Sequence, residues 1–185
     1  GNDGAGALGD DAAAGGRRVP EAVPGLTGVA QVVAADVHTC VRLDDGTARC
    51  FGNNTSYVLG DGSAEQWRLR PVAVAGLAGA IDLAAGAFST CARLSDGTAR
   101  CWGFNDRGQL GDGTLVTRAT PVTVRGPAGA ATLMGATTLA LAQTTTCGLL
   151  ADRTVRCWGS NAGGTLGLGY TDMSSHEGIG SAARN

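Results

Sequence analysis

The chain contains no lysine, and its charged residues of opposite sign nearly balance. All 14 basic residues are arginine, the acidic residues number 16, and the formal net charge is −2 at pH 7. The sequence therefore lacks the basic field that attracts nucleic acid or an acidic membrane surface. No apolar run approaches the length of a membrane span, so we expect none.

Histidine is also scarce, and no two cysteines have the Cys-x-x-Cys spacing of a zinc site. The motifs Gly-x-Ser-x-Gly and His-Glu-x-x-His and a phosphate loop ending in Lys are all missing. His38 stands at the offset of Ser89 in a repeated unit, which predicts a strand-end residue, and the other histidine is His176. The stretch from Asn105 to Asp112 lacks calcium-loop spacing. We predict a protein that is not an enzyme and that binds no cofactor or metal.

Aromatic residues make up only 4% of the chain, whereas glycine occurs 31 times. The glycines recur at fixed offsets within a unit that is present in three copies. The clearest copy runs from Cys91 to Thr114, and the others run from Cys40 to Gly62 and from Cys147 to Gly169. Frequent turns at regular spacing, without a sustained helical period, predict an all-β fold.

Each copy has two cysteines with a turn midway between them. In the first two copies the turn contains Asp-Gly, a β-hairpin signal, because glycine adopts the positive φ of tight loops. Folding the hairpin places its two cysteines opposite each other, so we predict the disulfides Cys40–Cys50, Cys91–Cys101 and Cys147–Cys157. Six cysteines allow other pairings, and free buried thiols are the alternative. Arg153 replaces the turn glycine in the third copy, which predicts a strained or differently shaped loop.

The repeat period of about 50 residues is typical of β-propeller blades. We expect an incomplete blade at 1–25, repeats at 26–75 and 76–125, a third repeat with an inserted loop at 126–180, and a tail at 181–185. Each repeat should hold four strands, with the fourth at Val72–Val74 and Val122–Val124, where valine alternates after a proline. Because no cysteine hairpin precedes the first segment, we expect the chain to begin inside a longer array.

Two other residue types recur at one offset in all three copies. Aromatic residues follow the second cysteine of each copy, and we interpret them as wedges between blades: Phe51, Trp102 and Trp158. Asparagine follows three residues later, and we interpret it as a turn residue that satisfies backbone groups: Asn54, Asn105 and Asn161.

These residues together resemble the repeats of the regulator of chromosome condensation family. The second copy carries the pattern most fully, with Cys91, Cys101, Trp102-Gly103, Asn105 and the run from Gln109 to Thr114. It looks closest to the bacterial, disulfide-paired members. The resemblance implies a partial β-propeller of about three to three and a half four-stranded blades from a seven-bladed ring. Half a ring leaves two open blade faces, so we expect a truncated product or self-association that completes the ring.

The predicted function is protein interaction through loops at the propeller faces. We expect a protein or a surface polymer as partner, with an interface at Trp67, Arg68 and Arg70, residue types favoured in interfaces. Paired cysteines place the chain in an extracellular, periplasmic or cell-surface setting. Two alternatives stay open. The resemblance implies nucleotide exchange on a small GTPase, and a likeness to a secreted β-lactamase inhibitor of the same superfamily suggests an enzyme inhibitor.

Overall fold

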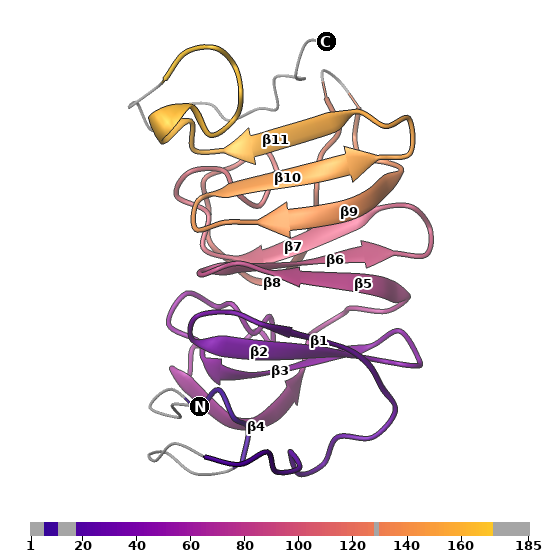
Figure 1. Ribbon diagram of the computed structural model, residues 1–185, viewed down its shortest axis with the longest axis vertical. Helices are drawn as coiled ribbons and strands as arrows, with labels where there is room; N and C mark the ends of the chain where they lie inside the picture. The colour runs from indigo at the N-terminus through magenta and orange to yellow at the C-terminus, as the bar shows by residue number, and fades with distance from the viewer. Residues whose placement is uncertain (1–5, 11–17, 128–129, 172–185) are drawn as a thin grey trace.

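The computed structural model describes residues 6–10, 18–127 and 130–171 (Figure 1). The predictions made for His176, for the end of the third repeat from 172 onward and for the tail at 181–185 lie outside the described residues. So do parts of the predicted incomplete blade at 1–25, namely 1–5 and 11–17.

The described residues form three antiparallel sheets, each built from consecutive strands. The first sheet contains β1 (Val29–Ala34), β2 (His38–Leu43), β3 (Ala48–Asn53) and β4 (Trp67–Ala73). The second contains β5 (Ala80–Ala85), β6 (Ser89–Leu94), β7 (Ala99–Gly103) and β8 (Arg118–Thr123). The third contains β9 (Ala136–Leu141), β10 (Thr145–Leu150) and β11 (Val155–Gly159), and the 3₁₀ turn η1 (Ala162–Gly164) follows it.

The three sheets stack on one another as successive blades, and the chain is a partial β-propeller (Figure 1). The first strand of each sheet lies beside that of the next, with β1 near β5 and β5 near β9. Small residues permit this approach. A Cβ atom added at Gly86 would lie 2.5 Å from the carbonyl oxygen of Ala142, so that position has no room for a side chain.

Two apolar cores lie between the sheets, one at each junction. The core between the first and second sheets includes the Cys40–Cys50 disulfide, Leu59, Leu83 and Trp102. The core between the second and third sheets has the corresponding members, listed here together: Cys91, Cys101, Leu110, Leu139 and Trp158. The predicted role of the recurring aromatic residues as wedges between blades is confirmed at Trp102 and Trp158.

The fourth strand differs from the prediction, because it begins earlier than the alternating valines. β4 starts at Trp67 and β8 at Arg118, and they end at Ala73 and Thr123. Pro71 and Pro121 lie within these strands and have no backbone N–H to donate. Strands can contain them because both strands lie at a sheet edge and their pairing register shifts at the prolines. Because the pairing is irregular there, no ladder hydrogen bond is required from the proline nitrogen. The segment before Pro71, which lies outside the predicted strand Val72–Val74, is therefore strand from Trp67 onward.

The third hairpin closes without glycine at its turn. Arg153 adopts a positive φ of 68°, as the prediction of a strained loop anticipated. Asp152 stabilises this turn, because its carboxylate accepts hydrogen bonds from the backbone N–H and the hydroxyl of Thr154 at 2.9 and 2.7 Å. The same Asp-x-Thr contacts occur in the other two hairpins. These bonds from the threonine lower the pKa of Asp152.

Candidate functional site

All three predicted disulfides are present, and each links the two strands of one hairpin. The paired cysteines are register partners, and their Cα atoms are 4.1 Å apart in every case. The described chain contains no free cysteine. The first two disulfides are fully buried by the following sheet, whereas Cys147 and Cys157 are only half-buried.

Each junction between sheets is held by one backbone carbonyl that accepts two hydrogen bonds. At the first junction the carbonyl oxygen of Val58 accepts from the indole N–H of Trp102 at 2.8 Å and from the hydroxyl of Thr90 at 3.0 Å. At the second, the carbonyl oxygen of Gln109 accepts from Trp158 at 3.0 Å and from Thr146 at 2.8 Å. The donors belong to one sheet and the acceptor to the loop of the preceding sheet, so both bonds fix one blade against the next.

The threonines of these junctions were not predicted from the sequence. They recur one residue before the first cysteine of each hairpin, and this offset was the available signal: Thr39, Thr90 and Thr146. The hydroxyl of Thr39 donates to the carbonyl oxygen of Ala7 at 3.0 Å, and Phe51 covers Gly9. The segment around Ala7 therefore lies against the first sheet as the loop at Val58 lies against the second.

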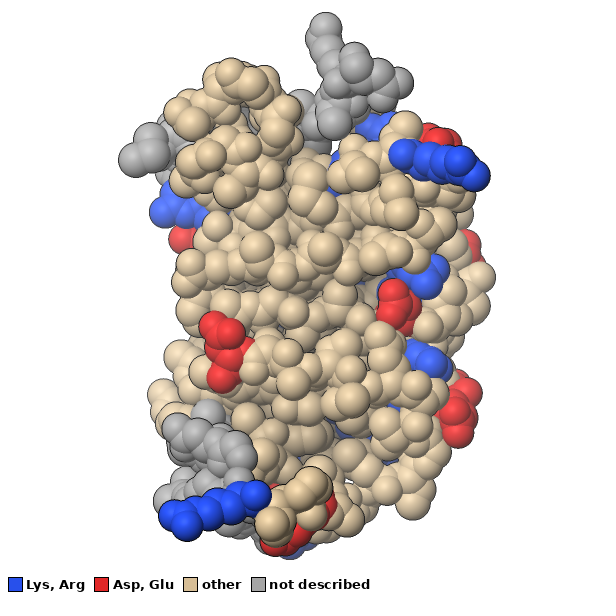
Figure 2. Space-filling model, viewed as in Figure 1, with Lys and Arg blue, Asp and Glu red and all other residues tan. Residues whose placement is uncertain are grey.

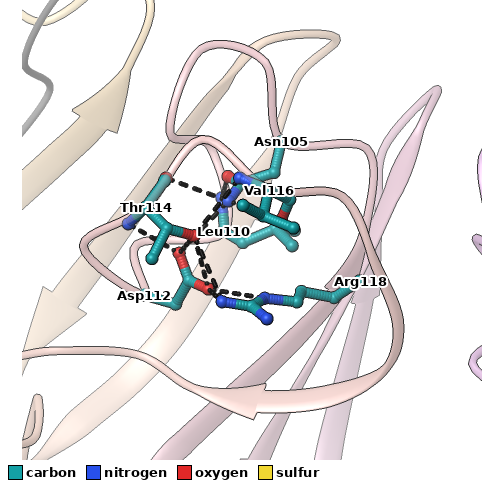
Figure 3. Close-up of polar contacts among 6 residues, drawn as sticks. All are labelled: Asn105, Leu110, Asp112, Thr114, Val116 and Arg118. Carbon is teal, nitrogen blue, oxygen red and sulfur yellow. Dashed lines mark hydrogen bonds and ion pairs between the residues drawn. The ribbon is translucent and has the colours of Figure 1, made fainter.

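The loop that follows the second hairpin is braced by a buried polar network (Figure 3). The side-chain amide of Asn105 donates to the carbonyl oxygens of Thr114 and Val116 at 3.0 and 3.1 Å and to Asp112 at 3.1 Å. Its oxygen accepts the backbone N–H of Leu110 at 2.9 Å. The predicted turn role of this asparagine is confirmed, because one side chain satisfies four groups of the loop.

An ion pair closes this network at the start of β8. The guanidinium of Arg118 contacts the carboxylate of Asp112 at 2.8 Å, and the aspartate is largely buried (Figure 3). Burial alone raises the pKa of Asp112, but the hydrogen bonds from Thr114 and the contact with Arg118 outweigh it and leave the pKa below its usual value. The carboxylate is therefore charged at neutral pH and holds the loop to the outer strand.

The first sheet repeats this arrangement with residues of the predicted interface. Arg68 contacts Asp61 at 2.8 Å and also forms an ion pair with Glu65, so its guanidinium is engaged within its own loop. Asn54 again binds loop carbonyls, those of Ser63 and Glu65, at 3.0 and 3.1 Å.

The third loop keeps the asparagine contacts but not the carboxylate. Asn161 donates to the carbonyl oxygen of Tyr170 at 2.8 Å and accepts the backbone N–H of Leu166 at 3.1 Å. Leu168 stands where the other loops have aspartate, so an Asp–Arg brace cannot form from this position.

The remaining members of the predicted interface lie at the surface. Trp67 is 48% exposed at the start of β4, and Arg70 is exposed farther along the same strand. Two further apolar residues, not predicted from the sequence, are exposed in the loop before β8: Leu115 at 47% and Val116 at 56%. The loop of the first sheet contacts β8 of the second, because the backbone N–H of Gly62 donates to the carbonyl oxygen of Ala119 at 3.0 Å.

His38 begins β2, as expected of a strand-end residue, and is fully buried. Its Nε2 atom forms a hydrogen bond with the hydroxyl of Thr90 at 2.9 Å, across the first junction. Its Nδ1 atom has no partner among the described residues. Burial lowers the pKa of His38 to about 4, so the ring is neutral at physiological pH.

Charged side chains are scattered over the visible face rather than gathered (Figure 2). Among the described residues, no three His, Cys, Asp or Glu side chains are placed to hold a metal ion. No described helix is long and apolar enough to cross a membrane. The described surface has exposed apolar side chains at Trp67, Leu115 and Val116. The buried carboxylates nearby form ion pairs that hold the loops to the outer strands.

The family models that match this chain describe the same repeat. Models of the regulator of chromosome condensation (RCC1) repeat match residues 29–57, 80–109 and 96–146. The human E3 ubiquitin-protein ligase HERC2 is 36% identical over 103 residues, which cover 54% of this chain and 2% of the ligase.

Two solved structures share the fold. Prp20p from Saccharomyces cerevisiae superposes with a TM-score of 0.75 at 17% identity, over 100% of this chain and 45% of that chain. Human WBSCR16 superposes with a TM-score of 0.72 at 21% identity, over 86% and 41% of the two chains. The chain thus spans less than half of either propeller. The repeat matches, which together cover about half of the sequence, show that the chain belongs to the regulator of chromosome condensation (RCC1) repeat family.

Proposed function

We propose that this protein is a non-catalytic protein-interaction module of an oxidising, extracytoplasmic compartment. The observation that carries the proposal is a set of exposed apolar side chains beside braced loops: Trp67 at the start of β4, and Leu115 and Val116 in the loop before β8. Exposed apolar and aromatic side chains held in fixed positions are typical of protein interfaces, because little conformational entropy is lost when a partner covers them.

The setting is inferred from the disulfides. Three paired cysteines and no free thiol in the described chain favour an extracellular, periplasmic or cell-surface location. Mass spectrometry of the protein isolated from its native source without reduction tests this part. Six alkylatable thiols would contradict it.

The partner we expect is a protein, with a surface polymer as the less favoured choice. Support comes from the fold, since Prp20p has binding properties toward Gsp1p and histones and has been crystallised with Kap60 bound. We expect Trp67, Leu115 and Val116, rather than Arg68, to make the contact, because Arg68 is held by Asp61 and Glu65.

Affinity capture from the extracytoplasmic fraction of the source tests these exposed side chains. The triple variant Trp67→Ala, Leu115→Ser, Val116→Ser should lose a specifically bound protein at least about tenfold relative to the unmodified chain. Met134→Ser is the matched control, because Met134 is an exposed apolar residue, at 56%, that lies outside this group. A partner retained by the triple variant, or lost equally in the control, would overturn the assignment.

The second candidate is nucleotide exchange on a small GTPase, which the family likeness and the Gsp1p binding of Prp20p favour. It predicts faster release of fluorescent GDP from a GTPase of the source when the oxidised protein is added. The enzyme-inhibitor alternative predicts instead a loss of activity of a secreted hydrolase at stoichiometric amounts of this protein.

A further inference from the structure

Tyr57 has a backbone conformation that the other two repeats reach with glycine. Its φ is 59°, and Gly108 and Gly164, which stand at the same offset after the second cysteine, have φ of 74° and 76°. The left-handed region is unfavourable for a residue with a side chain, whereas glycine enters it without a steric penalty. The first repeat therefore keeps a tyrosine at a position where the backbone favours glycine.

The fold makes little use of this side chain. The core at the first junction includes the next two residues, Val58 and Leu59, but Tyr57 is half-buried and belongs to neither core. Its hydroxyl forms no hydrogen bond with a described residue, and its ring pairs with no other described aromatic ring. An unfavourable backbone that packing does not explain is typical of a functional position.

The segment that carries Phe88 meets that of Tyr57 at the hydroxyl of Thr90. This hydroxyl donates to the carbonyl oxygen of Val58 at 3.0 Å, and Tyr57 directly precedes Val58. Phe88 lies two residues before Thr90 and packs edge-to-face on Phe104, with the ring centroids 6.2 Å apart. Both phenylalanines are half-buried, and the corresponding residues of the first and third sheets are not aromatic. Aromatic rings of two sheets thus gather at one end of the first junction.

Carboxylates lie beside these rings. Asp36 and Ala87, the neighbour of Phe88, both line a hollow of about 470 Å³ at the ends of the inner strands. Asp36 is exposed and forms no ion pair with a described residue. Asp106, in the loop that follows β7, has a side chain that is 44% exposed and contacts Arg107 at 3.4 Å. Negative charge and the negative faces of the rings therefore occur together.

The loops at this end of the sheets carry more acidic than basic residues. Together with the first two residues of β4 and β8, they hold five acidic residues and three arginines. Arg68 and Arg118 are already paired with Asp61 and Asp112. Apart from those two pairs, three acidic residues and one arginine remain, so a positively charged partner is favoured. The described loops counted here are 35–37, 54–66, 86–88, 104–117, 142–144 and 160–171.

We propose that Asp36, Tyr57, Phe88 and Phe104 form a site, here named the aromatic end, that receives an arginine-bearing segment of the partner protein. The guanidinium plane stacks on the aromatic faces, and the carboxylate of Asp36 pairs with its charge. Arginine suits this site better than lysine, because its planar group stacks on rings and is more weakly hydrated. The inference rests on the proposed function, since it states the chemistry of the same protein partner.

Isothermal titration of the full chain with three peptides of one design tests the role of charge. The peptides alternate leucine with arginine, with glutamate, or with citrulline, which keeps the shape of arginine but not its charge. We expect saturable binding of the arginine peptide, binding at least about fivefold weaker for the citrulline peptide, and no detectable binding of the glutamate peptide.

Tyr57→Gly tests the residue itself. It should weaken binding of the arginine peptide at least about fivefold. The midpoint of thermal unfolding should stay within about 2 °C or rise, because glycine relaxes the left-handed backbone. Tyr57→Phe keeps the ring face and should bind within about twofold of the unmodified chain. Tyr170→Gly is the matched control, because it removes a tyrosine that is 60% exposed outside the aromatic end, and its binding should also stay within about twofold.

Equal binding of the arginine and citrulline peptides would overturn the proposal, and so would binding that Tyr57→Gly leaves unchanged. A fall of more than about 5 °C in the unfolding midpoint of Tyr57→Gly would assign the side chain to the fold instead. A captured protein that the triple variant at Trp67, Leu115 and Val116 releases, but Tyr57→Gly retains, would contradict the arginine site and leave the proposed function intact. Charge-dependent peptide binding without any captured protein would contradict the proposed function and support the site.

Discussion

The indole N–H of Trp102 donates to the backbone carbonyl oxygen of Val58 at 2.8 Å, joining β7 of one sheet to the loop of the sheet before it. Both residues are almost fully buried. The contact thus combines a wedge of apolar surface with a directional bond, and it fixes the spacing and the rotation of one blade relative to the next. Repeating it is what turns a series of similar hairpins into a propeller.

Replacing Trp102 by phenylalanine should lower the free energy of unfolding by about 1–3 kcal/mol, from the lost hydrogen bond and the smaller ring in a filled core. Guanidinium unfolding with the disulfides intact measures the change. Trp67→Phe provides the control, since Trp67 is 48% exposed and the change there should stay within about 0.5 kcal/mol. Equal effects of the two substitutions would contradict the assigned role of the junction.

Removing the guanidinium of Arg118 should leave the carboxylate of Asp112 buried without its charged partner. We expect Arg118→Ala to destabilise the fold by about 1–3 kcal/mol. The matched change is Arg107→Ala, because Arg107 is 40% exposed and contacts Asp106 at 3.4 Å on the surface, where such pairs contribute less than about 1 kcal/mol. Thermal unfolding of both variants separates the two cases, and similar losses would argue against a brace.

His38 predicts a pH dependence of stability between about pH 6.5 and 4. The pKa is about 4 in the folded protein and 6.5 for an unburied histidine, so the unfolded chain binds more protons in this range. Stability is therefore fully present above pH 6.5 and falls as the pH approaches 4, by about 3 kcal/mol in total.

The variant His38→Ser, which copies the residue at Ser89, isolates this effect. His176 is present in both proteins, so its titration cancels when the two are compared. The difference in free energy of unfolding between variant and unmodified chain should change by about 3 kcal/mol between pH 7 and pH 4. A difference that does not vary with pH would show that His38 is not the responsible group.

The third disulfide should be reduced before the other two. Cys147 and Cys157 are half-buried, whereas the other four cysteines are 0% exposed, so a thiolate reagent reaches only the third bond without an opening of the sheets. Mild reduction followed by alkylation and peptide mass spectrometry should label Cys147 and Cys157 severalfold faster. Simultaneous labelling of all six would indicate that reduction requires global unfolding instead.

Much of the local structure followed from the spacing of a few residues. The distance between Cys91 and Cys101, with Asp-Gly between them, determined the hairpin and its disulfide, because a two-stranded turn leaves one register in which both residues face each other. The offset shared by Phe51, Trp102 and Trp158 predicted wedges, since a residue repeated once per blade meets the same neighbour each time.

The contacts that brace the loops and the start of the outer strands came only from the tertiary structure. Nothing in the spacing of Arg68 and Asp61 distinguishes an exposed arginine from a brace, because the outcome depends on where the loop returns to β4. The start of β4 at Trp67 was not predicted for the same reason. Pairing of Trp67 and Arg68 with β3 extends the strand on the N-terminal side of Pro71. Sequence alone determined the hairpins through local turn geometry, while the stacking of sheets decided which carbonyls, rings and charges are buried and which remain available.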